Sequence, residues 1–248
     1  MKEFLKNAKE NIGKILGTLV LISFIAPIGF LIFRIATTSN VVTEATIGGR
    51  VKSDYILMLL ECLLGIWAMS LPDMLTKKFS LEIPDKIYYL YILFLYSAIF
   101  LGEVRDFYYV IPYWDTVLHT MSGLMMGFFG FSLVDILNNT NKRVTLSPFF
   151  IAFFAFCFAI TVGVIWEVYE FTADGIFGTN MQKYKLQDTT ELIGREAVKD
   201  TMEDLIVDGA GAFIASGIGY ISLKYKKGWL NDLRIKYKRN KDEETEDE

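Results

Sequence analysis

The stretch PFFIAFFAFCFAITVGVIWEVYEFTA, residues 148–173, is long and apolar enough to cross a lipid bilayer as one helix. A helix rises about 1.5 Å per residue, so about 20 mainly apolar residues span a hydrocarbon core of about 30 Å. Two glutamates, Glu167 and Glu170, nevertheless stand in the second half of this stretch. The stretch therefore predicts a membrane span that carries ionisable side chains.

Other segments on either side have the same character, so the predicted fold class is an all-α, polytopic transmembrane bundle of about six helices. The expected helices cover about residues 14–35, 55–73, 87–104, 113–137, 148–173 and 200–223. They form one predicted transmembrane domain, 1–223, whose first helix should bend at Pro27. The connection 174–199 is expected to hold a short helix at about 189–198. Residues 224–248 should be a charged cytoplasmic tail, disordered at its end KDEETEDE.

The overall composition agrees with a multi-pass protein of the cell membrane. Apolar residues make up 52% of the chain and charged residues 22%, but the charges cluster between the apolar runs. Both cysteines, Cys62 and Cys157, lie within apolar runs, which argues against a disulfide framework or a cysteine zinc site. The net charge of -4 argues against a nucleic-acid partner. The expected partner is the lipid bilayer itself.

The distribution of basic residues predicts the orientation of the bundle. Four lysines, Lys2, Lys6, Lys9 and Lys14, lie before or at the start of the first apolar run. Basic residues recur in 74–86, in 138–147 and after residue 223. These regions all fall on one side of a six-span bundle, and such lysines and arginines favour the cytoplasmic side. Both termini are therefore predicted to be cytoplasmic.

Acidic residues and the single histidine recur at helical spacing on three of the predicted spans. An ionisable side chain at the centre of a bilayer costs about 2.5–3.5 kcal/mol on insertion scales, so it marks a functional site by default. The sets are Asp115 and His119 (i, i+4), Glu167, Glu170 and Asp174 (i, i+3, i+7), and Asp200, Asp204 and Asp208 (i, i+4, i+8). With the predicted orientation, all three sets and Glu61 converge near the non-cytoplasmic face.

So many carboxylates in a low dielectric need neutralisation. Protonation, pairing with Arg105, Arg195 or Lys199, or a bound cation would each provide it. Carboxylate oxygens with one imidazole suit Mg, Mn or Ca and would accept Zn or Fe, so a divalent metal cation is the expected cofactor. The candidate metal ligands are His119, Glu167, Glu170, Asp204 and Asp208. The candidate catalytic residues are Asp115, His119, Glu167, Glu170, Asp200 and Asp204.

Each of these residues also has a purely structural interpretation. A lone histidine on a helix is more often a packing residue than a ligand, and Asp115 or Asp200 at a helix start is commonly a cap. Asp174 and Glu103 would be unremarkable in the headgroup layer. Such roles explain the acidic residues that lie well inside their runs less well. Those residues are Glu61, Glu167, Asp204 and Asp208.

Three strings in the sequence carry a family resemblance: YWDTVLHTMSG (113–123), WEVYEF (166–171) and DTMEDLIVDGAGA (200–212). They resemble motifs on successive helices of the family of bacterial and archaeal inner-membrane proteins that includes YjdF. The match covers about residues 55–223. Phe171 stands where a second tryptophan often closes the middle motif. The resemblance implies the fold and a shared polar site at Asp115, His119, Glu167, Glu170, Asp200 and Asp204, but no particular reaction.

These observations leave three functional hypotheses. The first is a divalent-cation site that faces outward and supports hydrolysis or transfer on a lipid or lipid-linked substrate. The second is a cation- or proton-coupled transporter or channel, although Asp135 is the main polar residue in the inner halves of the helices. The third is a scaffold or sensor whose carboxylates hold helices together.

Overall fold

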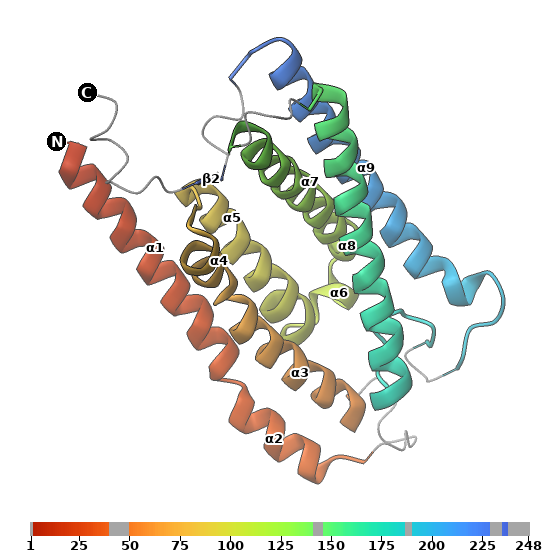
Figure 1. Cartoon of the computed structure of the whole chain (residues 1–248). Coiled ribbons are helices and arrows are strands. Elements are labelled where there is room, and N and C mark those ends of the chain that lie inside the picture. Colours follow the sequence, from red (N-terminus) through yellow and green to blue (C-terminus); the bar gives the residue numbers. More distant parts are fainter. Residues whose placement is uncertain (1, 40–49, 141–145, 187–189, 229–234, 238–248) are drawn as a thin grey trace, which may run out of the picture.

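The computed structural model describes residues 2–39, 50–140, 146–186, 190–228 and 235–237, and within these ranges the chain is almost entirely helical (Figure 1). The helices are α1 (Lys2–Ile25), α2 (Ile28–Thr37), α3 (Lys52–Ala68), α4 (Leu71–Phe79), α5 (Asp85–Leu95), the π-helix η2 (Tyr96–Val104), α6 (Phe107–Val110), α7 (Trp114–Thr140), α8 (Pro148–Phe177), the 3₁₀ helix η3 (Glu196–Val198) and α9 (Lys199–Lys224). Two short strands, β1 (Leu81–Glu82) and β2 (Lys236–Tyr237), pair antiparallel.

Six helical segments among the described residues are long and apolar enough to cross a membrane. They are Ile12–Thr37, Lys52–Phe79, Asp85–Val104, Trp114–Val134, Pro148–Phe177 and Glu196–Lys224. A chain of helices satisfies its backbone hydrogen bonds internally, as the bilayer core requires. The predicted all-α bundle with six spans is therefore confirmed. Its direction in the membrane stays a prediction.

The first span breaks at the proline that the sequence singled out. α1 ends at Ile25 and α2 begins at Ile28, with Pro27 between them at φ -73°. Proline has no backbone N–H to donate to the preceding turn, so the helix cannot continue unchanged through it. The backbone of Leu31 donates to the carbonyl of Pro27 at 2.9 Å, which starts the new helix at once.

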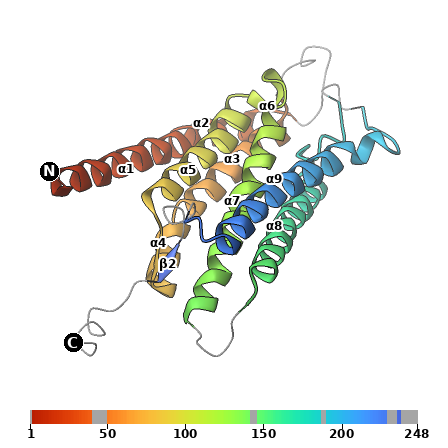
Figure 2. The ribbon, with the colours of Figure 1, turned by 90° about the horizontal axis from the view of Figure 1, so that it is seen from above.

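The helices form two groups that Figures 1 and 2 show side by side. The first helix group contains α1, α2, α3, α5 and η2, and the second contains α7, α8 and α9. Large apolar side chains fill the first group. Those with almost no exposed surface are Phe24, Leu31, Met58, Cys62 and Ile92.

Small residues bring the helices of the second group close together. A Cβ added at Gly211 on α9 would overlap the backbone of Thr120 on α7. A Cβ at Gly127 would lie 2.7 Å from the Cβ of Ala215, and one at Gly219 would lie 2.5 Å from the ring of Phe131. Such close backbone approach is typical of membrane helix packing, where lipid supplies no hydrophobic drive between helices.

The second group gives the bundle two distinct ends. At the end called the Trp114 end, α7 begins, α8 ends and α9 begins (lower part of Figure 1). The opposite end, called the Lys224 end, holds the start of α1 and the β1–β2 pair, in which Leu81 faces Tyr237. The first helix therefore begins, and the last helix ends, on the same side of the bundle, as six spans require. The expected disordered segment, 241–248, lies outside the described residues.

The connection after α8 differs from the expectation. A helix at about 189–198 was predicted, but within the described part of this segment, 190–198, only the three residues of η3 are helical. The backbones of Lys185 and Glu191 instead form an isolated antiparallel β-bridge, and the backbone of Leu192 donates to the carbonyl of Tyr184 at 2.8 Å. Gly194 has φ +65°, a left-handed conformation that interrupts a right-handed helix. The prediction was wrong because local turn hydrogen bonds outweigh helix propensity in this connection.

Candidate functional site

All three sets of acidic residues lie at the Trp114 end of the second helix group. Asp115 and His119 start α7, while the glutamates and Asp174 come from the last turns of α8. The remaining set comes from the first turns of α9. The structure thus brings together the residues that the spacing put at matching depth. Several are less than a tenth exposed, namely His119, Glu167, Glu170, Asp174, Asp204 and Asp208.

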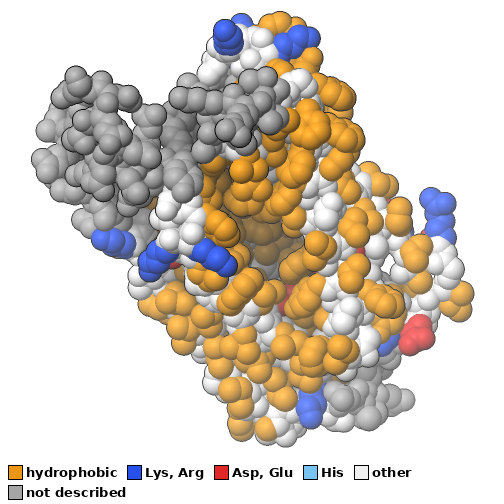
Figure 3. Space-filling model, viewed as in Figure 1, with side chains coloured by type: hydrophobic (Ala, Val, Ile, Leu, Met, Phe, Trp, Pro, Cys, Tyr) orange, Lys and Arg blue, Asp and Glu red, His pale blue; other side chains and the backbone are white. Residues whose placement is uncertain are grey.

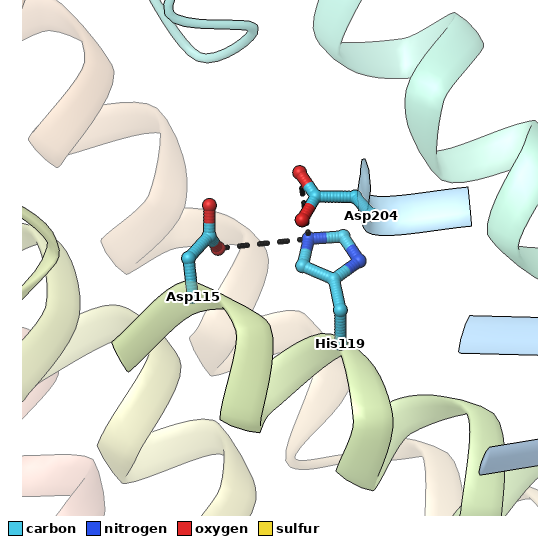
Figure 4. A group of neighbouring side chains, drawn as sticks. All are labelled: Asp115, His119 and Asp204. Carbon is cyan, nitrogen blue, oxygen red and sulfur yellow. Dashed lines mark ion pairs between the residues drawn. The ribbon is translucent and has the colours of Figure 1, made fainter. Parts of the chain in front are cut away.

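His119 lies at the centre of this cluster. Its Nε2 is 3.6 Å from Asp115 Oδ1 and 3.8 Å from Asp204 Oδ2. Figure 4 shows the carboxylate of Asp115, on the same helix, and that of Asp204, from α9, both directed at the imidazole. One ring nitrogen therefore faces two carboxylates from two different helices.

Asp208 lies on the other side of the imidazole. Its Oδ2 is 3.3 Å from Nδ1 of His119, which favours the tautomer that carries its proton on Nδ1. A glycine makes room for this carboxylate, since a Cβ at Gly163 on α8 would lie 2.7 Å from Asp208 Oδ2. Asp208 thus orients the ring and leaves the Nε2 lone pair toward Asp115 and Asp204.

Two groups of side chains place possible ligand atoms within 4.8 Å of one another. The groups, among the described residues, are Asp115, His119 and Asp204, and His119, Glu167 and Glu170. Two ligands on opposite sides of an ion at about 2.1–2.4 Å lie roughly 4.2–4.8 Å apart, so this spacing fits a metal ion. Asp208 and Asp200, two of the sequence candidates, belong to neither group. Their contacts are to His119 and to a lysine.

Glu167 gives independent evidence about the site. The residue is 5% exposed, and neither carboxylate oxygen has a hydrogen-bond partner among the described residues. Burying a carboxylate without a partner is costly unless it is neutralised or coordinates an ion. The donor set therefore fits a divalent cation in both spacing and chemistry.

Lys183 is the basic partner that the sequence reasoning missed. Its Nζ donates to Oδ2 of Asp115 and, at 2.9 Å, to Oδ1 of Asp200. Burial opposes the charge, but these two carboxylates outweigh it and raise the pKa of Lys183 above its ordinary value. Of the three basic residues expected in this role, Arg105 and Arg195 are exposed. Lys199 instead lies 4.0 Å from Glu203 on the surface.

Asp174 holds the loop that carries Lys183. Its carboxylate accepts hydrogen bonds from the Thr179 hydroxyl at 2.6 Å and from the backbone N–H groups of Met181 and Gln182 at 2.8 and 3.0 Å. The residue is 4% exposed, so it is buried within the protein, and its depth in the membrane stays a prediction. Asp174 is a positioning residue, because three hydrogen bonds from its own loop use both of its oxygens.

A cavity of about 50 Å³ lies beside His119, between the two helix groups. Glu61 on α3 and Glu103 on η2 line it from the first group, opposite Glu170. Glu103 is 9% exposed and lines the cavity, so it too is buried within the protein. Figure 3 shows the molecule hollowed between the helix groups, with acidic atoms at the lower edge of the hollow. The acidic site therefore extends beyond the second group.

The Lys224 end of the second group is mainly apolar. Phe131 and Val134 on α7 pack against Ile151 and Ala155 on α8. The side chain of Asp135, the polar residue noted in the inner half of α7, lies outside the described residues. Among the described side chains, the carboxylates of this group gather at one end, whereas the other end holds rings, aliphatic groups and three buried serines, Ser132, Ser216 and Ser222.

Comparisons with known proteins agree with the membrane fold. Residues 28–225 match the model of a family described as "Predicted membrane protein (DUF2238)". An uncharacterized protein from Thermotoga maritima is 30% identical over 143 residues, which cover 56% of this chain and 64% of that relative. No solved structure matches. Because the family model covers most of the chain and all of the candidate site, this protein belongs to the DUF2238 family of predicted membrane proteins.

Proposed function

We propose that this membrane protein binds a divalent cation with His119, Glu167, Glu170 and Asp204. The observation that carries the proposal is the unpartnered carboxylate of Glu167, which is buried in a group of possible ligand atoms. The two groups of ligand atoms share one imidazole, so we assign them to one centre. Oxygen ligands with a single imidazole suit Mg, Mn or Ca.

The surrounding residues have separate roles in this proposal. Asp208 orients the imidazole from behind, as carboxylates commonly do for metal-bound histidine. Lys183 pairs with both Asp115 and Asp200 and offsets one of their two negative charges without occupying His119. The carboxylates of the proposed ligand set are then left for a bound ion to neutralise.

We further propose that the centre catalyses hydrolysis or group transfer on a lipid or lipid-linked substrate. An ion held there would polarise a substrate oxygen and lower the pKa of a bound water. The apolar packing of Phe131, Val134 and Ile151 at the Lys224 end favours a site that opens at one end over a transport path. A cavity carboxylate outside the proposed ligand set, such as Glu61, could accept a proton.

Thermal unfolding of the purified protein in detergent tests the cation proposal. A bound ion stabilises the folded state by RT ln(1 + [L]/Kd), about 2.7 kcal/mol at a hundredfold excess over Kd. The melting temperature should fall after chelation and recover with Mg²⁺, Mn²⁺ or Ca²⁺. Glu167→Gln should abolish the recovery. Glu203→Gln, an exposed change on α9 beside Asp204, should leave it intact.

The same melting experiment has two outcomes that count against the cation proposal. A melting temperature that does not respond to chelator or to any of these ions between pH 5 and 8 would contradict the proposal. Recovery of equal size in Glu167→Gln and in the wild type would also contradict it, because the ion would then bind elsewhere.

A further inference from the structure

We infer that the cavity between the two helix groups binds a small organic ammonium group, held by Glu61 and Glu103. The inference goes beyond the cation centre, which shares Glu170 and His119 with this cavity, and it does not require an ion to be bound there. It rests on the cavity walls: buried carboxylates without hydrogen-bond partners, aromatic rings, and two glutamates that belong to no group of possible metal ligands among the described residues.

Three glutamates line the cavity without an ion pair to a basic side chain among the described residues, although Lys183 lines the same cavity. Glu61, Glu103 and Glu170 are each at least nine-tenths buried. Among the described residues, none of the three makes a side-chain hydrogen bond or an ion pair. Protonation or a cation neutralises buried carboxylates in this state, and a cation with N–H donors would supply hydrogen bonds as well.

The basic side chains at this end are already engaged. Lys183 pairs with Asp115 and Asp200, and Arg50 pairs with Asp106 at 2.5 Å and donates to the Val104 carbonyl at 3.1 Å. Neither makes an ion pair with the cavity glutamates. A cation that pairs with these glutamates would therefore come from a ligand.

The groups of possible metal ligands favour an organic cation beside Glu61 and Glu103. The described residues contain two groups of possible metal-ligand atoms within 4.8 Å, and neither includes Glu61 or Glu103. A bare ion beside these two glutamates would therefore need further ligands, such as water. An ammonium group with its attached carbon is larger and donates along separate directions. It can contact carboxylates that stand further apart.

Aromatic rings in the cavity wall point to the same ligand. Tyr108 and Trp166 line the cavity together with Tyr109. The ring of Tyr108 already faces a cation, because Lys183 Nζ lies 6.0 Å from its centroid. Carboxylates combined with aromatic faces are the surroundings in which proteins bind ammonium ligands.

The backbone shows how the fold places Glu103 in this wall. η2 is a π-helix, in which the backbone of Arg105 donates to the carbonyl of Phe100, five residues back, at 2.9 Å. The neighbouring Gly102 lets the Tyr108 ring pack close, since a Cβ there would lie 2.5 Å from it. Such π-helical turns are rare and frequently occur at functional sites.

The first test is a titration of the purified full-length protein with ethanolamine hydrochloride. It uses detergent, an amine-free phosphate buffer, a chelator and constant ionic strength. Trp166 lines the cavity, so its fluorescence should change saturably and Trp166→Phe should lose that change. Glu61→Gln and Glu103→Gln should each weaken the affinity at least tenfold. Glu82→Gln, an exposed change in β1, should leave it unchanged.

A second arm distinguishes a free amine from a lipid headgroup. The protein is placed in nanodiscs of phosphatidylglycerol with or without phosphatidylethanolamine, and the ethanolamine titration is repeated. A tenfold weaker apparent affinity with phosphatidylethanolamine present supports binding of the lipid headgroup. An unchanged affinity supports a free amine. Both results keep the assigned ligand chemistry.

Two results would overturn the inference. One is the absence of any saturable response to ethanolamine together with no effect of phosphatidylethanolamine. The other is a response that Glu61→Gln and Glu103→Gln leave unchanged while gel filtration shows both variants to be monodisperse. Glu61→Asp, which keeps the charge, is the folding control. Mn²⁺ stabilisation measured in Glu61→Gln tests the cation centre separately, and it should be retained.

Discussion

The first helix group packs around large apolar side chains, whereas the second packs around glycine, alanine and carboxylates. Phe24, Met58 and Ile92 fill the first group with almost no exposed surface. In the second group Gly123 and Gly211 bring α7 against α9, and buried carboxylates occupy one end. Close backbone approach and buried charge together leave little apolar filling at that end. The second group therefore supplies most of the acidic site, to which the first group adds Glu61 and Glu103.

The largest effect should come from removing a large side chain of the first group. Phe24→Ala should destabilise the protein by about 3–5 kcal/mol, because it removes a fully buried ring and leaves a cavity. Phe33→Ala, at a position that is 61% exposed on α2, should cost far less. Unfolding in detergent with increasing SDS measures both. Equal losses in the two variants would show that the first group has no packed core of this kind.

The sequence predicted this division only in part. Helical spacing placed Asp115, His119 and Asp204 together because all three lie on regular helices with a fixed rise per residue. It did not find Lys183, because a loop residue has no period that fixes its position. Asp208 was taken for a ligand, and only the contact with Gly163 and His119 shows that it stands behind the imidazole.

The next prediction compares the change in stability when each of two glycines on α9 is replaced by alanine. Gly211→Ala should destabilise by about 1–3 kcal/mol, because its Cβ would meet the backbone of Thr120, which cannot move aside as a side chain can. At Gly217 a Cβ meets nothing within 4 Å, so Gly217→Ala should stabilise by up to about 1 kcal/mol through helix propensity. Melting temperatures of the two variants check this. A shift of the same sign in both would contradict the close α7–α9 contact.

The smallest of these effects concerns the Lys183 pairs. Lys183→Met should cost about 1–2 kcal/mol, between the values for exposed and buried pairs, because Lys183 is only partly buried. The folded pKa of Lys183 is raised. Its contribution is therefore complete below the unfolded value of about 10.4 and is lost as pH rises through the folded value. Stability measured from pH 7 to 11 should fall at the alkaline end less steeply in Lys183→Met. Identical slopes would argue against the pairs.

The most direct test of the cation centre uses the fact that the protein has one histidine. Pulsed EPR of Mn²⁺ bound to the purified protein should show coupling to an imidazole nitrogen, and that nitrogen can only belong to His119. The coupling should vanish in His119→Gln and persist in Glu203→Gln. Bound Mn²⁺ without nitrogen coupling in the wild-type protein, or no bound Mn²⁺ at all, would contradict the proposed centre.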